Sequence, residues 1–117
     1  MAFTITNHHA EGVQVLALTG RLVLGDGTGA LRAAVDRALS GGEGVLLDLG
    51  GLTYMDSAGL GEMVGAHASA STKGQKLKLL RPQPRIGSML QITKLYTTFE
   101  VFQEEAAALA SFASSAE

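Results

Sequence analysis

The stretch GVLLDLGGLTYMDSAGLG, residues 44–61, decides the fold that the rest of the chain is expected to adopt. Its first part, Val45–Leu49, is a short apolar run bounded by glycines, which predicts a buried strand. The chain is then expected to turn at Gly50-Gly51, and the apolar spacing becomes helical from Leu60 onward. Asp56-Ser57 therefore stands where the passage out of a strand opens a helix.

Short oxygen-bearing side chains at a helix start act as N-caps, and either Asp56 or Ser57 can fill that place. Ala58, Gly59 and Gly61 remove bulk from the first turn, although glycine inside a helix costs about 1 kcal/mol relative to alanine. The unpaired N–H groups of a helix start also favour an added anion. The residues alone thus leave two interpretations of Ser57, a plain cap and an acceptor of a phosphate that adds about −1.5 to −2 charges.

The same residues carry a resemblance to a known family. With Asp48-Leu49 at the strand end and Met55-Asp56-Ser57 before Gly59-Leu60-Gly61, the stretch resembles STAS domains, and among these most of all the bacterial anti-sigma-factor antagonists. The likeness extends from about Val13 to about Phe112. It implies that Ser57 is phosphorylated by a partner that is both anti-sigma factor and serine kinase, and it leaves a phosphatase open as a further partner. The partner-binding residues that it implies are Asp56, Ser57, Ala58, Gly59, Gly61 and Asp26.

The chain departs from this family in two places. Antagonists usually carry an acidic residue three positions after the glycine that ends the second strand, but Val23 stands there. The nearest acid is Asp26, which would have to take that role from a longer loop. If it does not, the resemblance no longer implies phosphorylation of Ser57. Lys94 also stands where most members have a glycine, which is expected to change only a local turn.

Composition indicates one folded domain. The chain has 117 residues, 46% hydrophobic and 17% charged, which suits a core-forming domain rather than a disordered segment. Its formal charge of −2 argues against a nucleic-acid surface. It has no cysteine, so disulfides and thiolate metal sites are excluded. No apolar run reaches the length of a membrane span, and the cytoplasm is the expected location.

The order of predicted elements implies an α/β fold. Strands are expected at Phe3–Thr6, Val13–Leu18, Val45–Leu49, Leu77–Leu80 and Phe99–Phe102, and helices at about Ala30–Leu39, Ser57–Ser71, Ile86–Thr93 and Glu104–Phe112. We expect one STAS-like domain over residues 1–117, with a core of about 3–112 and a frayed tail from Ser114. Its sheet is predicted to be mixed and mostly parallel, with about five strands and about four helices, and Val45–Leu49 at the centre. Gly65 is expected on the outer side of the second helix, facing a partner.

Other functions find weaker support in the sequence. Gly25–Ala30 fits a loose dinucleotide fingerprint, and Asp48 follows about 20 residues later, but Gly20 is expected to break the preceding strand. This nucleotide-binding alternative ranks second, together with an unphosphorylated STAS scaffold in a stress-signalling or lipid-transport complex. Ser57 is no hydrolase nucleophile, because Met55 stands where that motif needs glycine. We therefore expect no catalytic residues, no cofactor and no bound metal.

Overall fold

The computed structural model describes residues 3–25 and 27–115 of the chain. In chain order the elements are β1 (Thr4–Ala10), β2 (Val13–Leu22), α1 (Thr28–Ser40), β3 (Gly44–Met55), α2 (Ser57–Thr72), β4 (Leu77–Leu80), α3 (Pro84–Ile92), the 3-10 helix η1 (Leu95–Thr97), β5 (Val101–Phe102) and α4 (Glu105–Ser115). The strands form one five-stranded sheet in the order β1-β2-β3-β4-β5. β1 is antiparallel to β2, and the other pairs are parallel. The predicted mixed sheet with β3 at its centre is confirmed.

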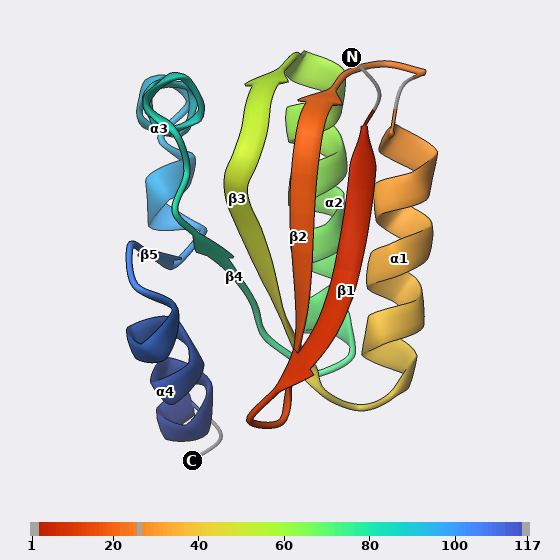
Figure 1. The fold of residues 1–117 in the computed structure, drawn as a ribbon, viewed down its shortest axis with the longest axis vertical. Coiled ribbons are helices and arrows are strands. Elements are labelled where there is room, and N and C mark those ends of the chain that lie inside the picture. Colours follow the sequence, from red (N-terminus) through yellow and green to blue (C-terminus); the bar gives the residue numbers. More distant parts are fainter. Residues whose placement is uncertain (1–2, 26, 116–117) are drawn as a thin grey trace.

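The two faces of the sheet bury separate apolar clusters. Side chains alternate along β2, so Leu16 and Leu18 join the larger cluster with α1, α2 and α3, whereas Val13 and Val15 join the smaller one beneath α4. Parallel crossovers that all advance in one direction along the sheet place their helices on the same face. Figure 1 shows α1 and α2 behind β1–β3, with α4 well separated from them. On the opposite face of the sheet, which carries the smaller cluster, α4 is therefore the only helix within the described residues.

β3 is longer than predicted, because the glycine pair Gly50-Gly51 does not turn the chain. The strand runs through both residues to Met55. A Cβ on Gly51 would stand 2.6 Å from Cγ2 of Thr19, on the neighbouring strand β2. Gly51 thus permits a close approach between two strands, where the register shifts.

β2 likewise continues past Gly20 to Leu22, so the prediction that Gly20 breaks this strand was wrong. Gly20 has a φ of 94°, which glycine adopts at no steric cost, and the register against β3 shifts beside it. Because β2 is continuous, the loop after it begins at the same edge of the sheet as the loop after β3.

Several element ends differ from the prediction. β1 extends to Ala10, and the last strand is confined to Val101–Phe102. α4 continues to Ser115, beyond the expected start of the tail, and residues 116–117 lie outside the described ranges. Pro84 begins α3, as its missing N–H favours. None of the helices within the described ranges is both long and apolar enough to cross a membrane.

Candidate functional site

Asp56 joins two loops at the carboxyl edge of the sheet. It is the N-cap of α2, with an extended backbone at φ −96° and ψ −175°. Its Oδ1 accepts the N–H of Gly59 at 2.9 Å, and its Oδ2 accepts the N–H of Leu24 at 3.0 Å. The first bond closes the initial turn of α2, and the second ties the loop after β2 to it. Of the two candidate caps, Asp56 fills that place.

The same two bonds fix the charge of Asp56. Donation from the backbone N–H of Gly59, and then from that of Leu24, holds the pKa of the Asp56 carboxyl below its usual range. Asp56 is therefore a carboxylate at neutral pH, and its oxygens are engaged by backbone donors. A negative charge thus stands directly before Ser57 in the chain.

Ser57 is the first residue of α2, and its side chain is exposed. Because Asp56 serves as the cap, the Ser57 hydroxyl is not needed to close the helix. Among the residues that the structure describes, it has no hydrogen-bond partner. The hydroxyl is therefore accessible to a second molecule at the amino end of a 16-residue helix.

The small residues after Ser57 serve two different purposes. Gly61 is exposed, and a Cβ added there would meet nothing within 4 Å. Gly59 is buried, and a Cβ on it would press into the carbonyl oxygen of Leu22 and stand 2.9 Å from Cγ of Met55. Gly59 thus lets α2 pack closely on β2 and does not clear the surface. We define the Ser57 surface as Asp56, Ser57, Ala58 and Gly61, which are exposed or half-buried.

The loop between β2 and α1 brings an apolar side chain to this site. Leu24 is 76% exposed, and its N–H is the one bound by Asp56. Val23 is half-buried and forms an isolated bridge with Gly27. Asp26 lies outside the described residues, so its expected role beside Ser57 stays a prediction. Sequence reasoning missed Leu24, because its position depends on a contact between loops 32 residues apart.

The side of α2 that carries Gly65 faces α1 and not solvent, contrary to the prediction. Nη1 of Arg32, on α1, lies 2.8 Å from where a Cβ on Gly65 would stand. The same guanidinium pairs with Glu62 at 3.2 Å, and the neighbouring Ala66 is fully buried. The prediction that Gly65 makes room for a partner was wrong, because α1 packs along this side of α2.

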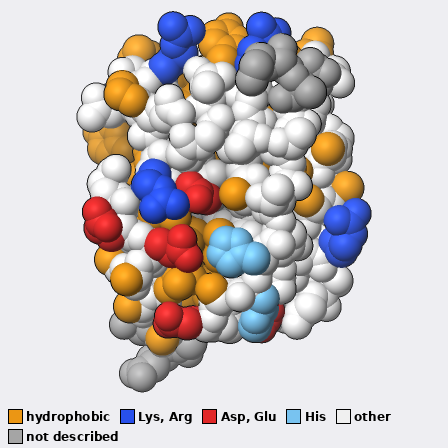
Figure 2. All heavy atoms as spheres, in the orientation of Figure 1, with side chains coloured by type: hydrophobic (Ala, Val, Ile, Leu, Met, Phe, Trp, Pro, Cys, Tyr) orange, Lys and Arg blue, Asp and Glu red, His pale blue; other side chains and the backbone are white. Residues whose placement is uncertain are grey.

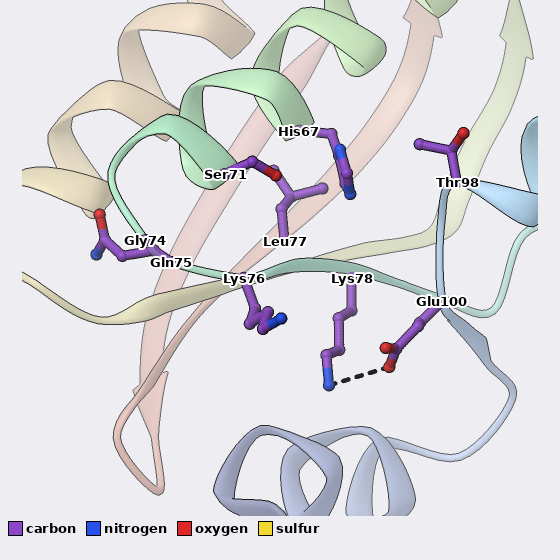
Figure 3. A pocket seen from close by; sticks show the side chains of 9 residues that line it. All are labelled: His67, Ser71, Gly74, Gln75, Lys76, Leu77, Lys78, Thr98 and Glu100. Atoms are coloured by element: carbon purple, nitrogen blue, oxygen red, sulfur yellow. Dashed lines mark ion pairs between the residues drawn. The ribbon is translucent and has the colours of Figure 1, made fainter. Parts of the chain in front are cut away.

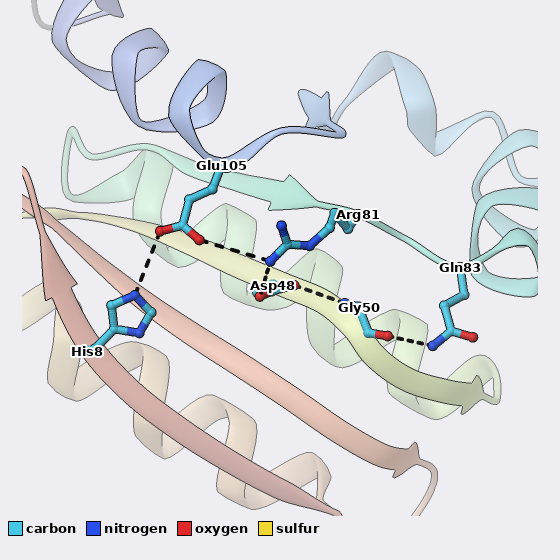
Figure 4. Close-up of polar contacts among 6 residues, drawn as sticks. All are labelled: His8, Asp48, Gly50, Arg81, Gln83 and Glu105. Atoms are coloured by element: carbon cyan, nitrogen blue, oxygen red, sulfur yellow. Dashed lines mark hydrogen bonds and ion pairs between the residues drawn. The ribbon is translucent and has the colours of Figure 1, made fainter.

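The residues of the nucleotide-binding alternative are engaged in contacts within the chain. A Cβ on Gly27 would stand 2.5 Å from Cδ2 of Phe3, so the aromatic ring covers this glycine. Asp48 accepts the N–H of Gly50 at 3.0 Å and pairs with Arg81 at 2.8 Å. Figure 4 shows Asp48 within a group of polar contacts on the sheet face that also carries α4. In this group, Glu105 lies near Arg81 and His8. Nucleotide binding at Gly25–Ala30 stays a prediction that these contacts do not favour.

One hollow among the described residues lies away from Ser57. It has a volume of about 410 Å³ and lies between the carboxyl end of α2 and the segment before β5. Figure 3 shows Lys78 pointing from β4 toward Glu100, and the two form an ion pair at 3.0 Å. Within the described ranges, no three His, Asp or Glu side chains are grouped so that they could hold a metal ion.

Comparison with known families agrees with this geometry. The family model described as "Mlab, STAS domain" matches residues 5–111 of the chain. The protein belongs to the STAS domain family. The match includes the cap at Asp56, the exposed Ser57 and the sheet that positions them.

Individual proteins similar to this chain include anti-sigma-factor antagonists. The chain is 27% identical over 111 residues to an anti-sigma F factor antagonist from Paenibacillus polymyxa, which covers 93% of this chain and 94% of that protein. An anti-sigma factor antagonist from Mycobacterium paratuberculosis has a TM-score of 0.82 at 18% identity, over 95% of this chain and 94% of that one. The phosphorylated form of the Bacillus cell fate determinant SpoIIAA has a TM-score of 0.70 at 22% identity, over 94% of this chain and 98% of that one. At such identities, the two solved structures show a shared fold.

Proposed function

We propose that this STAS domain is an anti-sigma-factor antagonist whose binding is switched by phosphorylation of Ser57. The observation that carries the proposal is the exposed Ser57 hydroxyl at the start of α2, directly after a carboxylate whose oxygens are bonded to backbone N–H groups. The curated relative from Paenibacillus polymyxa supports the antagonist role. The phosphorylated SpoIIAA structure supports a role for phosphate.

In the unphosphorylated state, the Ser57 surface docks onto the anti-sigma factor. Gly61 presents no side chain, so the backbone of a partner can approach the first turns of α2 closely. The exposed Leu24 beside this turn adds apolar area to the contact. The anti-sigma factor that is held in this way no longer binds its sigma factor.

In the phosphorylated state, the new charge opposes docking without unfolding the domain. A phosphate on Ser57 lies at the positive end of the α2 dipole, which stabilises the free protein. In the complex, the same phosphate and the Asp56 carboxylate must both lose water against a surface that does not neutralise them. Each 1.4 kcal/mol of this penalty weakens binding about tenfold, so a few kcal/mol release the partner.

The test compares wild type, Ser57→Ala and Ser57→Asp for affinity to an anti-sigma factor with serine kinase activity. We expect Ser57→Ala to bind like wild type, and Ser57→Asp to bind roughly tenfold more weakly or worse. Ser71→Asp is the matched control, because it adds the same charge to an exposed serine near the other end of α2. Equal affinity of all four proteins would refute the switch.

Incubation with the kinase and ATP separates this function from that of a fixed STAS scaffold. The intact mass is expected to rise by one phosphate in wild type and not in Ser57→Ala. An unchanged wild-type mass, together with tight binding to the same kinase, would favour the scaffold. Calorimetric titration with ATP, GTP and NAD tests the nucleotide-binding alternative at Gly25–Ala30.

A further inference from the structure

Arg21, Tyr54 and Arg85 meet at the carboxyl edge of the sheet, where the Ser57 surface also lies. Arg21 on β2 is in register with Tyr54 on β3, and Arg85 is in the first turn of α3. The guanidinium carbons of Arg21 and Arg85 lie 5.9 Å and 5.7 Å from the centroid of the Tyr54 ring. At these distances, a cation is attracted to the face of an aromatic ring. We call these three residues the Arg21–Tyr54–Arg85 patch.

The patch is exposed, and its charges have no carboxylate partner among the described residues. All three side chains are exposed, Tyr54 to 38%. Within the described part of the chain, neither Arg21 nor Arg85 forms an ion pair, whereas Arg32 and Arg81 each bind a carboxylate. In Figure 2, the acidic side chains lie in the middle and lower parts of the visible face, whereas basic side chains stand both at its upper rim and at mid-height. The patch is therefore a local positive region on a chain of net charge −2.

The patch lies close enough to Ser57 to be covered by the same partner. Tyr54 precedes Asp56 by two residues, which is about 7 Å along an extended strand. Arg21 precedes Leu24 by three residues, and the N–H of Leu24 is bonded to Asp56. A stable protein interface buries about 800 Å² on each partner. An interface of this area is wide enough to cover both the patch and the Ser57 surface.

We propose that the partner presents a segment rich in Asp or Glu to the Arg21–Tyr54–Arg85 patch while it contacts the Ser57 surface. This inference rests on the proposed function, because it specifies the chemistry of the same partner. Each guanidinium offers a planar fork of N–H donors that matches a carboxylate. Stacking on Tyr54 limits the side-chain entropy that Arg21 and Arg85 lose on binding. Tyrosine and arginine are also the residue types that dominate binding energy at interfaces.

The test uses the kinase identified by its phosphorylation of Ser57, with affinity measured at low and high salt. Arg21→Gln/Arg85→Gln is expected to bind roughly tenfold more weakly than wild type, with a shallower salt dependence. Arg37→Gln/Lys73→Gln is the matched control, because it removes two exposed charges from the ends of α1 and α2 that lie away from Ser57. The control is expected to bind within about twofold of wild type.

Three results would overturn this inference. If the patch variant binds like the control, the patch is not part of the interface, and a loss in Ser57→Asp would still support the switch. Wild-type binding to phosphatidylserine vesicles, lost in the patch variant, would assign these residues to an anionic membrane instead of an acidic protein. If no anti-sigma kinase binds wild type, the proposed function fails, and this inference fails with it. Unchanged thermal unfolding of the patch variant shows that its fold is intact.

Discussion

Two glycine-rich passages lead from a strand into a helix in this protein, and they use glycine differently. Between β2 and α1, glycine supplies backbone conformation, because Gly25 has a φ of 85° and Gly27 has a φ of 98°. Gly27 caps α1 without any side-chain hydrogen bond. In the passage from β3 into α2, Gly59 and Gly61 lie within the first turns of α2 and have ordinary negative φ, and the side chain of Asp56 caps the helix.

The difference shows which of the two passages is open to a second molecule. Phe3 covers the first passage at Gly27, so the amino end of α1 is packed by the chain itself. The second passage stays open at Gly61 and presents Ser57 to solvent. A string of glycines therefore indicates an anion or partner site only where the space beside it is open and a side chain already closes the helix.

The largest effect is expected from Gly59→Ala. Its Cβ would press into the Leu22 carbonyl oxygen and stand 2.9 Å from Cγ of Met55, and backbone cannot move aside cheaply. We expect a loss of about 2–3 kcal/mol of unfolding free energy in urea denaturation. The matched control Gly61→Ala enters open space and should instead add up to about 1 kcal/mol, because alanine favours the helix. Equal changes in the unfolding free energy of the two variants would contradict the conclusion that Gly59 is packed and Gly61 is open.

The next effect concerns the first passage, where Gly27→Ala is expected to cost about 2 kcal/mol. Part of this cost is the positive φ, which strains alanine by about 1 kcal/mol, and the rest is displacement of the Phe3 ring. Gly25→Ala isolates the first part, because its Cβ would meet nothing within 4 Å. Thermal or urea unfolding of both variants measures the difference. Equal losses would show that Phe3 does not close this passage.

Local patterns were enough to predict the element order and a helix cap at Asp56 or Ser57. A short carboxylate or hydroxyl before a helical pattern predicts a cap, and Asp56 is that cap. The role of a glycine, in contrast, depends on what lies opposite it in the fold. Gly50-Gly51 serves strand pairing, Gly59 packs on β2 and Gly65 faces Arg32. None of these contacts has a signal in the local sequence.

The Arg21–Tyr54–Arg85 patch escaped sequence analysis for the same reason. Its residues come from β2, β3 and α3, and only the sheet register and the start of α3 bring them together. Leu24 reaches Asp56 through a similar contact between distant segments. Sequence patterns thus located the phosphate acceptor candidate but not the chemistry of the surface around it.

The side-chain cap of the second passage predicts a pH dependence of the folding stability. The folded-state pKa of Asp56 is lowered by the N–H groups of Gly59 and Leu24. A lowered carboxyl pKa adds stability above the unfolded-state value of about 4, and this stability is lost as pH falls through the folded-state pKa. At about pH 7, Asp56→Asn should therefore melt below wild type, and the gap in melting temperature should narrow by about pH 2. A gap that stays constant with pH would show that the charge of Asp56 does not contribute.

The smallest effect is expected at Lys94. This residue has a positive φ, as Gly25 and Gly27 of the first passage have, but it is not a glycine. Lys94 has a φ of 62° and a ψ of 19° before η1, a left-handed conformation that costs a non-glycine residue about 1 kcal/mol. Lys94→Gly removes this strain but also makes the unfolded chain more flexible, so we expect a net gain of a few tenths of a kcal/mol. The melting temperature should rise by one to a few degrees. Lys94→Ala keeps the strained backbone and should not be stabilised, so an equal rise in both variants would trace the gain to loss of the lysine side chain.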